Sequence, residues 1–182
     1  IDDLIYKSQE QALLLKQNKQ KILNNFLHND EFGANLEKEK WETFEYGELV
    51  NHIEEKEKNL ANRSTAKYVG VKHIDTLDTR IKGVFDEEMP TYFRKFKKGQ
   101  ILFAKRRAYQ KKVAIASFDG ICSPHLWALE SINEKLLQDF LPFLMQSDVF
   151  YDYVNKHSAG TMSTYLKWEA LSKYKINLPP IR

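Results

Sequence analysis

The sequence predicts an α+β fold, with a mixed β-sheet and flanking helices preceded by a long helix of the coiled-coil type. Three observations support this class. Short apolar runs typical of buried strands gather in the middle of the chain, helical patterns gather toward its C-terminal end, and the first 27 residues contain neither glycine nor proline. The 182 residues are 42% hydrophobic, which is enough apolar mass for one core.

The N-terminal segment 1–27 is rich in glutamine, lysine and leucine, which favour helices. Its apolar residues follow the alternating spacing of four and three that forms a heptad seam. Six positions are the expected helix interface: Ile1, Ile5, Ala12, Leu15, Ile22 and Phe26. An amphipathic helix packed on its own domain is the alternative. We therefore divide the chain into a coiled-coil-type helix (1–28), a polar linker (29–40) and a domain (41–182).

Within the domain, apolar and β-branched runs predict strands, and longer mixed segments predict helices. The expected strands are 68–71, 100–104, 112–116 and 174–178, and the expected helices are 49–60, 133–146, 149–156 and 164–172. Ser131, with Glu134 three residues later, has the spacing of a capping box for the helix from 133.

Several classes of protein are excluded by composition. The closest glycines are thirteen residues apart, so neither a dinucleotide-binding fingerprint nor a Walker A loop can be written. The apolar runs are far shorter than the roughly 20 residues of a membrane span, and mean hydropathy is −0.56. One cysteine and the lack of a signal peptide at Ile1 point to the cytoplasm and to a mature piece or a fragment.

Charge is unevenly distributed although the net charge is only +3. Segment 30–60 is acidic, whereas segment 91–112 carries nine basic residues, several aromatic residues and no acid. Unopposed cations with aromatic residues suit a nucleic-acid backbone, and the alternative is a solvated loop whose counter-charges come from elsewhere in the fold. The expected DNA-contacting residues are Lys105, Arg106, Arg107, Tyr109, Lys111, Lys112, Lys97 and Lys98, with Lys72, His73, Thr161 and Ser163 on flanking loops. Arg106 and Arg107 are the better specificity candidates, because arginine can bond guanine through two hydrogen bonds.

No catalytic residue and no metal ligand is expected. Cys122, Ser123 and His125 are close in sequence, but triads are assembled from distant segments around an oxyanion hole. The five histidines show no metal-ligand spacing. Glu54-Glu55-Lys56 matches a magnesium-nuclease motif only in its letters, because the stretch 49–60 has the charge pattern of a solvated helix.

Several short motifs follow one another along the chain. They are Lys98-Gly99-Gln100-Ile101-Leu102-Phe103 and the segments 1–5, 41–49, 68–74, 118–123, 141–147, 158–161, 168–171 and 176–180. In their residues and their order, these motifs resemble the DNA specificity subunit of Type I restriction-modification systems over nearly the whole chain. The motif that begins at Lys98 is similar to the family's Gly-Asp-Ile-Leu segment, with Gln100 where aspartate is common.

The resemblance implies a non-catalytic subunit that recognises one half of a split double-stranded DNA target. Modification subunits would then bind S-adenosylmethionine and methylate adenine, and a restriction subunit would use ATP and magnesium. Full subunits of the family carry two recognition domains separated by two antiparallel spacer helices. The chain thus resembles the second half of such a subunit, or a reduced form that self-associates through its helix, with no membrane involved.

Three other hypotheses stay open at this point. A stand-alone coiled-coil dimer could bind a palindrome as a regulator. The acidic stretch 30–60 could dock a protein partner while the basic segment only solvates a loop. A magnesium nuclease without a recognisable motif would nick plasmid DNA when metal is added.

Overall fold

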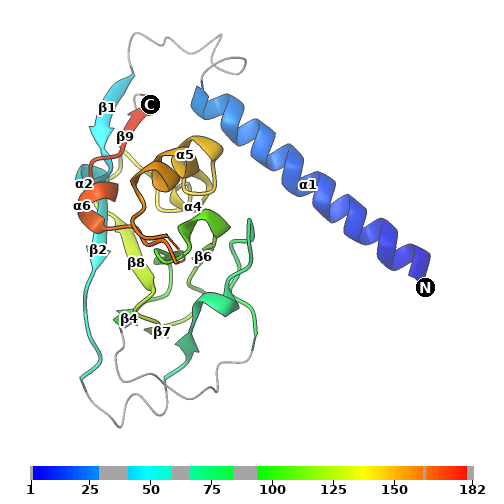
Figure 1. Cartoon of the computed structure of the whole chain (residues 1–182), viewed down its shortest axis with the longest axis horizontal. Coiled ribbons are helices and arrows are strands. Elements are labelled where there is room, and N and C mark those ends of the chain that lie inside the picture. Colours follow the sequence, from blue (N-terminus) through cyan, green and yellow to red (C-terminus); the bar gives the residue numbers. More distant parts are fainter. Residues whose placement is uncertain (1, 29–40, 59–65, 84–93, 162, 180–182) are drawn as a thin grey trace.

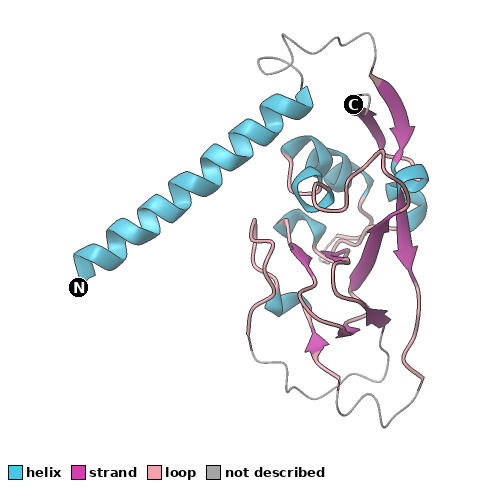
Figure 2. Ribbon diagram, turned by 180° about the vertical axis from the view of Figure 1, so that it is seen from behind, coloured by secondary structure: helices cyan, strands magenta, loops and turns pink. Residues whose placement is uncertain are grey.

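The structure, a computed structural model, describes residues 2–28, 41–58, 66–83, 94–161 and 163–179. A straight helix, α1 (Asp2–His28), extends away from a body built of three small β-sheets and several short helices (Figure 1). Figure 2 shows the same arrangement from behind, with the helices of the body gathered toward one end and the smallest strands toward the other. The predicted α+β class is confirmed. The N-terminal segment is one long helix as predicted, and its coiled-coil character stays a prediction.

The central sheet has four antiparallel strands in the order β2 (Val50–Ile53), β8 (Leu126–Ser131), β5 (Ile101–Ala104) and β6 (Val113–Ile115). Both faces of this sheet are buried. On β5, Ile101 and Phe103 join the larger core cluster beside the helices, whereas Leu102 and Ala104 join the smaller cluster on the other face. Because side chains alternate along a strand, burial of both faces requires a continuous apolar run. This explains why the predicted strands at 100–104 and 112–116 are found almost as expected.

A second sheet covers the face of the central sheet that carries Leu102. It consists of β3 (Tyr68–Val69), β7 (Gly120–Cys122) and β4 (Arg94–Phe96), with β3 and β7 parallel and β7 and β4 antiparallel. A Cβ atom on Gly120 would lie 2.5 Å from the carbonyl oxygen of Lys67, so the backbones here approach more closely than any other residue permits.

Four short helices contribute residues to the larger core cluster: α2 (Tyr46–Leu49), α4 (Leu141–Leu144), α5 (Asp148–His157) and α6 (Trp168–Leu171). The hydroxyl of Ser147 accepts a hydrogen bond from the amide of Phe150 at 3.2 Å, which caps α5. A two-stranded sheet pairs β1 (Glu42–Glu45) with β9 (Lys175–Leu178). The predictions for 149–156 and 174–178 are therefore confirmed. Two single turns of 3₁₀ helix, η3 (Val71–His73) and η4 (Ala108–Gln110), complete the elements.

The prediction of a helix over 49–60 is wrong. Strand β2 pairs with β8 in this segment, and the chain then continues extended, with the amide of Lys95 donating to the carbonyl of Glu55 at 2.8 Å. The carboxylates that suggested a solvated helix face lie instead beside two cations of β4: Glu54 is 3.2 Å from Arg94, and Glu55 is 3.0 Å from Lys95. Cross-strand pairing thus outweighs local helix propensity.

The helix predicted over 133–146 is reduced to the single turn of α4, and the capping role of Ser131 is wrong. Ser131 ends β8, and its hydroxyl donates to the carbonyls of Asn133 and Leu136. Gln138 holds the intervening loop, because its Oε1 accepts from the amide of Ser131 at 2.7 Å and its Nε2 donates to the carbonyl of Gly99 at 2.8 Å. These side-chain bonds offer the backbone an alternative to a helix.

Two further elements are shorter than predicted. The helix over 164–172 begins only at Trp168, because Tyr165 pairs with Ala159 and the amide of Leu166 donates to the carbonyl of Lys105 at 2.9 Å. The strand over 68–71 ends at Val69, where η3 follows after one residue.

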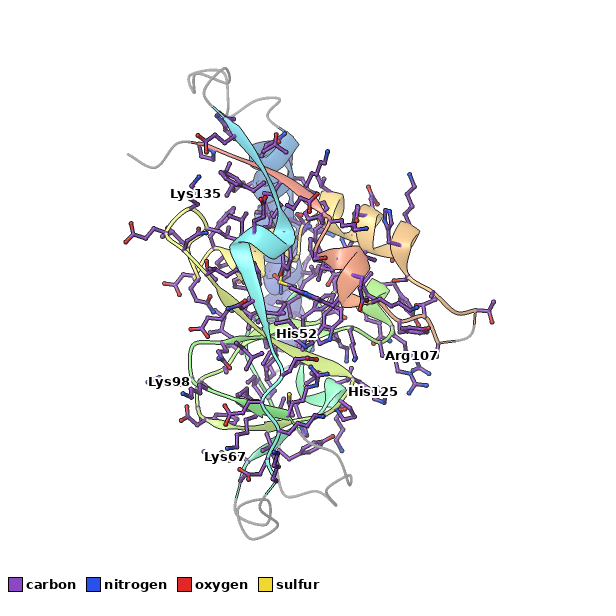
Figure 3. All side chains as sticks on the ribbon, turned by 90° about the vertical axis from the view of Figure 1, so that its left-hand side faces the viewer. His52, Lys67, Lys98, Arg107, His125 and Lys135 are labelled. Carbon is purple, nitrogen blue, oxygen red and sulfur yellow. The ribbon has the colours of Figure 1, made fainter. Side chains whose placement is uncertain are left out.

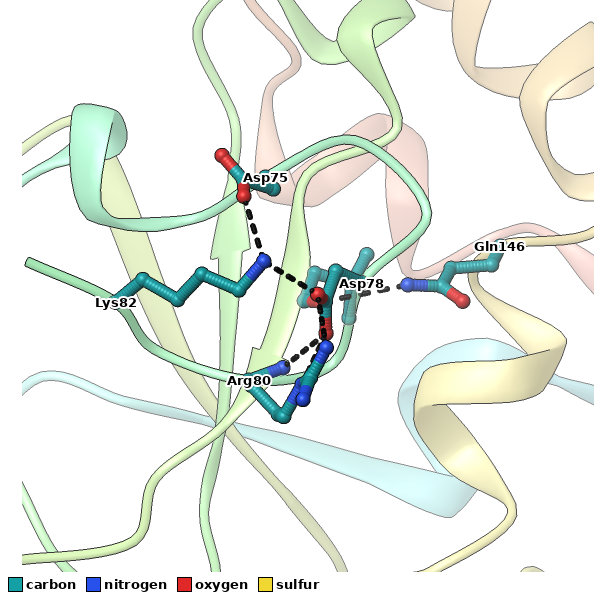
Figure 4. A network of polar contacts seen from close by, with 6 residues as sticks. Asp75, Asp78, Arg80, Lys82 and Gln146 are labelled. Atoms are coloured by element: carbon teal, nitrogen blue, oxygen red, sulfur yellow. Dashed lines mark hydrogen bonds and ion pairs between the residues drawn. The ribbon is translucent and has the colours of Figure 1, made fainter. Parts of the chain in front are cut away.

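The loop 75–82 braces the turn between β5 and β6. Its centre is Asp78, which is 7% exposed. The Asp78 carboxylate accepts hydrogen bonds from Nε and Nη2 of Arg80 and forms an ion pair with Lys82 (Figure 4). The hydrogen bonds from Arg80 hold the pKa of Asp78 well below its ordinary value. The hydroxyl of Thr76 donates to the carbonyl of Gln110 at 2.8 Å. This bond ties the loop to residues 105–112 between β5 and β6, which we call the basic turn.

Two residues of the predicted helix interface have described side chains, whereas the linker lies outside the described residues. Leu15 is 70% exposed and Ile22 is 56% exposed, so these two seam residues do not pack on the domain. The side chains of Ile1, Ile5, Ala12 and Phe26, and the whole linker 29–40, lie outside the described residues. The heptad interface and the domain boundaries therefore remain predictions.

Candidate nucleic-acid interface

The basic segment divides into residues that are neutralised within the fold and residues that face outward. Arg94 is 9% exposed and lies between His52 and Glu54. Lys95 is paired with Glu55 and Glu57 at 3.0 and 3.4 Å. The charges of these two residues serve the sheet, which is what the alternative hypothesis of counter-charges from elsewhere anticipated.

The outward-facing group, which we call the basic ridge, consists of Lys105, Arg106, Arg107 and His125. The strand β5 ends at Ala104, and its antiparallel neighbour β8 begins opposite it at Leu126. The ridge residues therefore lie just beyond the end of this ladder, where the amide of Lys105 donates to the carbonyl of His125 at 3.1 Å. Figure 3 shows Arg107 and His125 on the same side of the molecule.

A second segment, which includes residues 159–161 and 163–165 of one loop, lies beside the ridge and comes from the C-terminal part of the chain. Ala159 and Tyr165 exchange two backbone hydrogen bonds of 2.9 Å, and Arg106 forms a bridge with Tyr165. The amide of Arg107 donates to the carbonyl of Thr164 at 2.7 Å. Of the predicted contacts in this loop, the fold brings Ser163 beside Arg106 from a distant part of the sequence, whereas Thr161 is exposed on the same loop.

Arg106 is held by side chains from two other segments. Its Nε donates to the hydroxyl of Ser163 at 2.7 Å, and its Nη1 lies 3.1 Å from Nε2 of His125. Because a guanidinium can only donate, Nε2 accepts, which requires a neutral imidazole with its proton on Nδ1. Burial, followed by the charges of Arg106 and Lys105, lowers the pKa of His125, in agreement with the neutral form.

Arg107 and Tyr109 project from the turn that follows. Arg107 has φ 52°, in the left-handed region, and so does Lys111 at the other end of η4. Arg107 is exposed, and Tyr109 is 52% exposed. The turn thus presents a cation and an aromatic ring to solvent, a combination suited to phosphate and sugar.

A cleft of about 590 Å³ adjoins the ridge. Aromatic and basic side chains line much of it: His52, Arg94, Lys105, Trp127, Tyr165, Lys167 and Trp168. Glu54, Leu166 and Glu169 complete the lining. The His52 ring lies 5.2 Å from that of Trp127 and 5.3 Å from that of Trp168, and burial lowers the pKa of His52 to about 4. Lys105 extends its ammonium over the Trp127 ring at 5.6 Å, and burial lowers its pKa as well.

The other predicted DNA contacts are not brought to the ridge as free cations. Lys111 is paired with Asp148, and Lys112 donates to the carbonyl of Val71 at 3.1 Å. His73 is buried, and its Nδ1 accepts from the amide of Gly70 at 3.0 Å, so the ring supports η3 rather than facing a ligand. Lys72 is exposed on the same turn.

Lys97 and Lys98 lie apart from the ridge. They line a separate hollow of about 780 Å³ together with residues such as Gln100 and Asp119. In Figure 3, Lys98 and Arg107 point to opposite sides of the molecule. The predicted contacts therefore do not form one continuous surface.

Sequence reasoning missed His125, Tyr165 and Lys167 as members of the interface. In the sequence His125 stands out only as a member of a catalytic group with Cys122 or as one of five candidate metal ligands. The Cys122 thiol is buried, and burial raises its pKa to about 12. A thiol with that pKa is protonated at neutral pH and is not a nucleophile. The signal that could have drawn attention to His125 is its place directly before a buried strand that pairs with β5.

Within the described part of the chain, histidine, cysteine, aspartate and glutamate do not gather into any group of three or more suited to a metal ion. None of the helices in this part has the length and apolar character needed to cross a membrane.

Comparison with known proteins places this arrangement in a family. The family described as "Type I restriction modification DNA specificity domain" matches residues 38–182. The chain therefore belongs to the Type I restriction-modification DNA specificity family, which confirms the resemblance seen in the sequence. It is similar to the Type I restriction enzyme EcoDI specificity subunit of Escherichia coli, with 25% identity over 144 residues covering 78% of this chain.

Solved structures show the same fold. The HsdS subunit from Thermoanaerobacter tengcongensis matches 98% of this chain with a TM-score of 0.60 and 15% identity. The Type I restriction-modification S subunit from M. genitalium matches 83% of it with a TM-score of 0.54 and 12% identity. The chain spans 32% of the EcoDI subunit and 43% and 37% of these two structures.

Proposed function

We propose that this chain supplies DNA sequence recognition to a Type I restriction-modification complex, with the domain 41–182 recognising one half of a split target. The observation that supports this role is the basic ridge. Three cations from one turn, an arginine held by two neutral acceptors and an aromatic cleft form an outward surface on a DNA specificity domain. Such a surface combines phosphate attraction with a side chain suited to a base edge.

In this proposal the chemistry belongs to other subunits. Modification subunits bind S-adenosylmethionine and methylate adenine, and a restriction subunit uses ATP and magnesium, while this chain is non-catalytic and acts in the cytoplasm. What supports this division is the family match together with the glycine spacing, which fits neither a dinucleotide-binding fingerprint nor a Walker A loop.

The helix α1 is proposed to pack against a second helix, from a further spacer segment or from a second copy of this chain. The exposed Leu15 and Ile22 support this, because leucine and isoleucine at heptad positions are stabilised by a partner. Replacing both with lysine should abolish self-association of the purified chain in sedimentation equilibrium. A wild-type chain that stays monomeric at high micromolar concentration would exclude a second copy as the partner.

The decisive experiment is a genome-wide map of methylated adenines in the source organism, with and without this gene. Loss of one gapped, two-part motif is the expected result, and it would also give the target sequence. An unchanged map in cells with active modification subunits would refute the proposal and favour the stand-alone dimeric regulator.

A further inference from the structure

The strongest unexplained feature of the interface is the set of contacts that fix Arg106. A solvent-exposed arginine ordinarily samples many rotamers, and ordering such a side chain on binding costs conformational entropy. Here the guanidinium has partners from two other segments before any ligand arrives, Ser163 at 2.7 Å and His125 at 3.1 Å. An arginine ordered in advance can discriminate between ligands more sharply, because its side chain loses less conformational entropy on binding.

His125 is the rigid member of this pair. Its amide is held by the hydroxyl of Ser123 at 3.2 Å, and its carbonyl accepts from the amide of Lys105 at 3.1 Å. Ser123 is itself buried, with its amide bonded to the carbonyl of Val69 at 2.9 Å and its carbonyl accepting from the amide of Leu126 at 2.9 Å. The imidazole is therefore attached to a turn that both sheets fix, whereas Ser163 belongs to a loop.

The hydrogen-bond count at Arg106 leaves capacity for a base. A guanidinium carries five N–H groups, and the two described partners use one on Nε and one on Nη1. Both Nη2 hydrogens and one on Nη1 remain. When His125 accepts the Nη1 hydrogen that faces away from Nη2, the other Nη1 hydrogen and one Nη2 hydrogen form a parallel pair, which matches the O6 and N7 acceptors that guanine presents in the major groove.

From this geometry we infer that His125 is a positioning residue for sequence recognition: it orients Arg106 so that Arg106 selects guanine at one position of the target. This inference rests on the proposed function. It assigns to His125 a role through Arg106 and no contact with the DNA itself.

The test uses the specificity chain assembled with its modification subunits. Methylation is measured on a library of duplexes in which each position of the target carries each of the four bases. Arg106→Ala first identifies the position whose guanine preference depends on Arg106. His125→Leu is then expected to lower that preference roughly tenfold, since an arginine that is no longer held in place loses part of its bidentate contact with guanine, and to leave all other positions unchanged.

Further variants separate positioning from folding. His125→Gln retains an acceptor and should restore most of the preference, which a merely structural role would not predict. Ser163→Ala removes the other acceptor from an accessible loop and should weaken the preference at the same position. The control is His157→Leu, because His157 is an exposed histidine whose ring stacks on Tyr153 at 3.9 Å and not on the ridge.

The outcomes are distinct. If Arg106→Ala alters no position, or if His125→Leu and Ser163→Ala change methylation equally for all sequences or not at all, the inference is overturned while the proposed function stands. If the wild-type complex methylates without sequence preference, the proposed function fails and this inference fails with it.

Discussion

Asp148 connects the long helix to the recognition domain, and its replacement by alanine provides a sensitive test of this junction. Its carboxylate accepts from Nε2 of Gln20 at 3.3 Å and from the amide group of Asn24, and it also pairs with Lys111 of the basic turn. In return, the backbone amide of Asp148 donates to Oδ1 of Asn24 at 3.0 Å. Burial acts to raise the pKa of Asp148, but the bonds from Lys111, Asn24 and Gln20 outweigh it and lower the pKa.

The expected cost follows from these contacts. The side chain is 50% exposed, so each of its two hydrogen bonds to α1 contributes about 0.5–1 kcal/mol, toward the low end for such bonds. The ion pair with Lys111 lies within the domain, so it does not contribute to the contact with α1. Asp148→Ala should therefore weaken docking of α1 by about 1–2 kcal/mol, which corresponds to roughly 5- to 30-fold faster exchange through undocking.

Hydrogen exchange with mass spectrometry measures this directly. Amides around residues 19–24 of α1 should exchange faster in Asp148→Ala, because local undocking exposes them without global unfolding. The matched control is Asp152→Ala, an exposed aspartate one turn later on α5. Equal exchange of α1 in both variants would refute the view that Asp148 secures the helix.

Three further results are expected. Arg106→Ala combined with Arg107→Ala should abolish target methylation without unfolding the domain, and normal methylation by this folded variant would remove both residues from the interface. Since the pKa of His52 falls from 6.5 in the unfolded chain to about 4 in the folded domain, the unfolded state takes up a proton first as the pH drops through this range. Urea unfolding should show about 1–2 kcal/mol less stability at pH 4 than at pH 7 from this group after allowance for solvent screening, and an unchanged pH slope in His52→Gln would contradict it. Gly120→Ala should cost about 3 kcal/mol in urea unfolding, because its Cβ would meet the Lys67 carbonyl at 2.5 Å, and a loss below about 1 kcal/mol would disagree with this packing.

The parts of the fold that the sequence predicts well are those whose burial is complete. The run Ile101–Ala104 is apolar at every position because both faces of β5 are covered, and its pattern needs no knowledge of distant partners. Helix α5 is likewise marked by its own cap at Ser147. These signals are local, so they survive in a single sequence.

The wrong predictions concern segments whose state depends on residues far along the chain. The strand β2 and its extension occupy a stretch that looks like a charged helix, and what holds them is β8 together with Arg94 and Lys95 of β4. The loop before α4 depends on Gln138 reaching the carbonyl of Gly99, 39 positions earlier. Neither partner can be identified from the local pattern.

The same distinction explains how much of the interface could be predicted. The absence of acids between 91 and 112 correctly marks a cationic region, but it gives equal weight to Arg94 and Arg106. Burial separates the two residues. Arg94 is buried and paired with Glu54 and His52, so its charge is not available to a ligand. Arg106 gains its partners from Ser163, 57 positions later, while its charge stays accessible.

Rigidity and exposure are combined at one place because the ridge begins where a doubly buried sheet ends. Ala104 and Leu126, the last paired residues of β5 and β8, are almost fully buried, and the next residues on either side are Lys105 and His125. A side chain on a loop can approach DNA but is imprecise, whereas one within the sheet is precise but inaccessible. One residue beyond the ladder, the backbone is still fixed by the bond from Lys105 to His125, and the side chains already reach solvent. Substitutions that loosen the end of this ladder should therefore reduce base discrimination more than overall DNA affinity, since phosphate attraction depends on charge and only weakly on exact position.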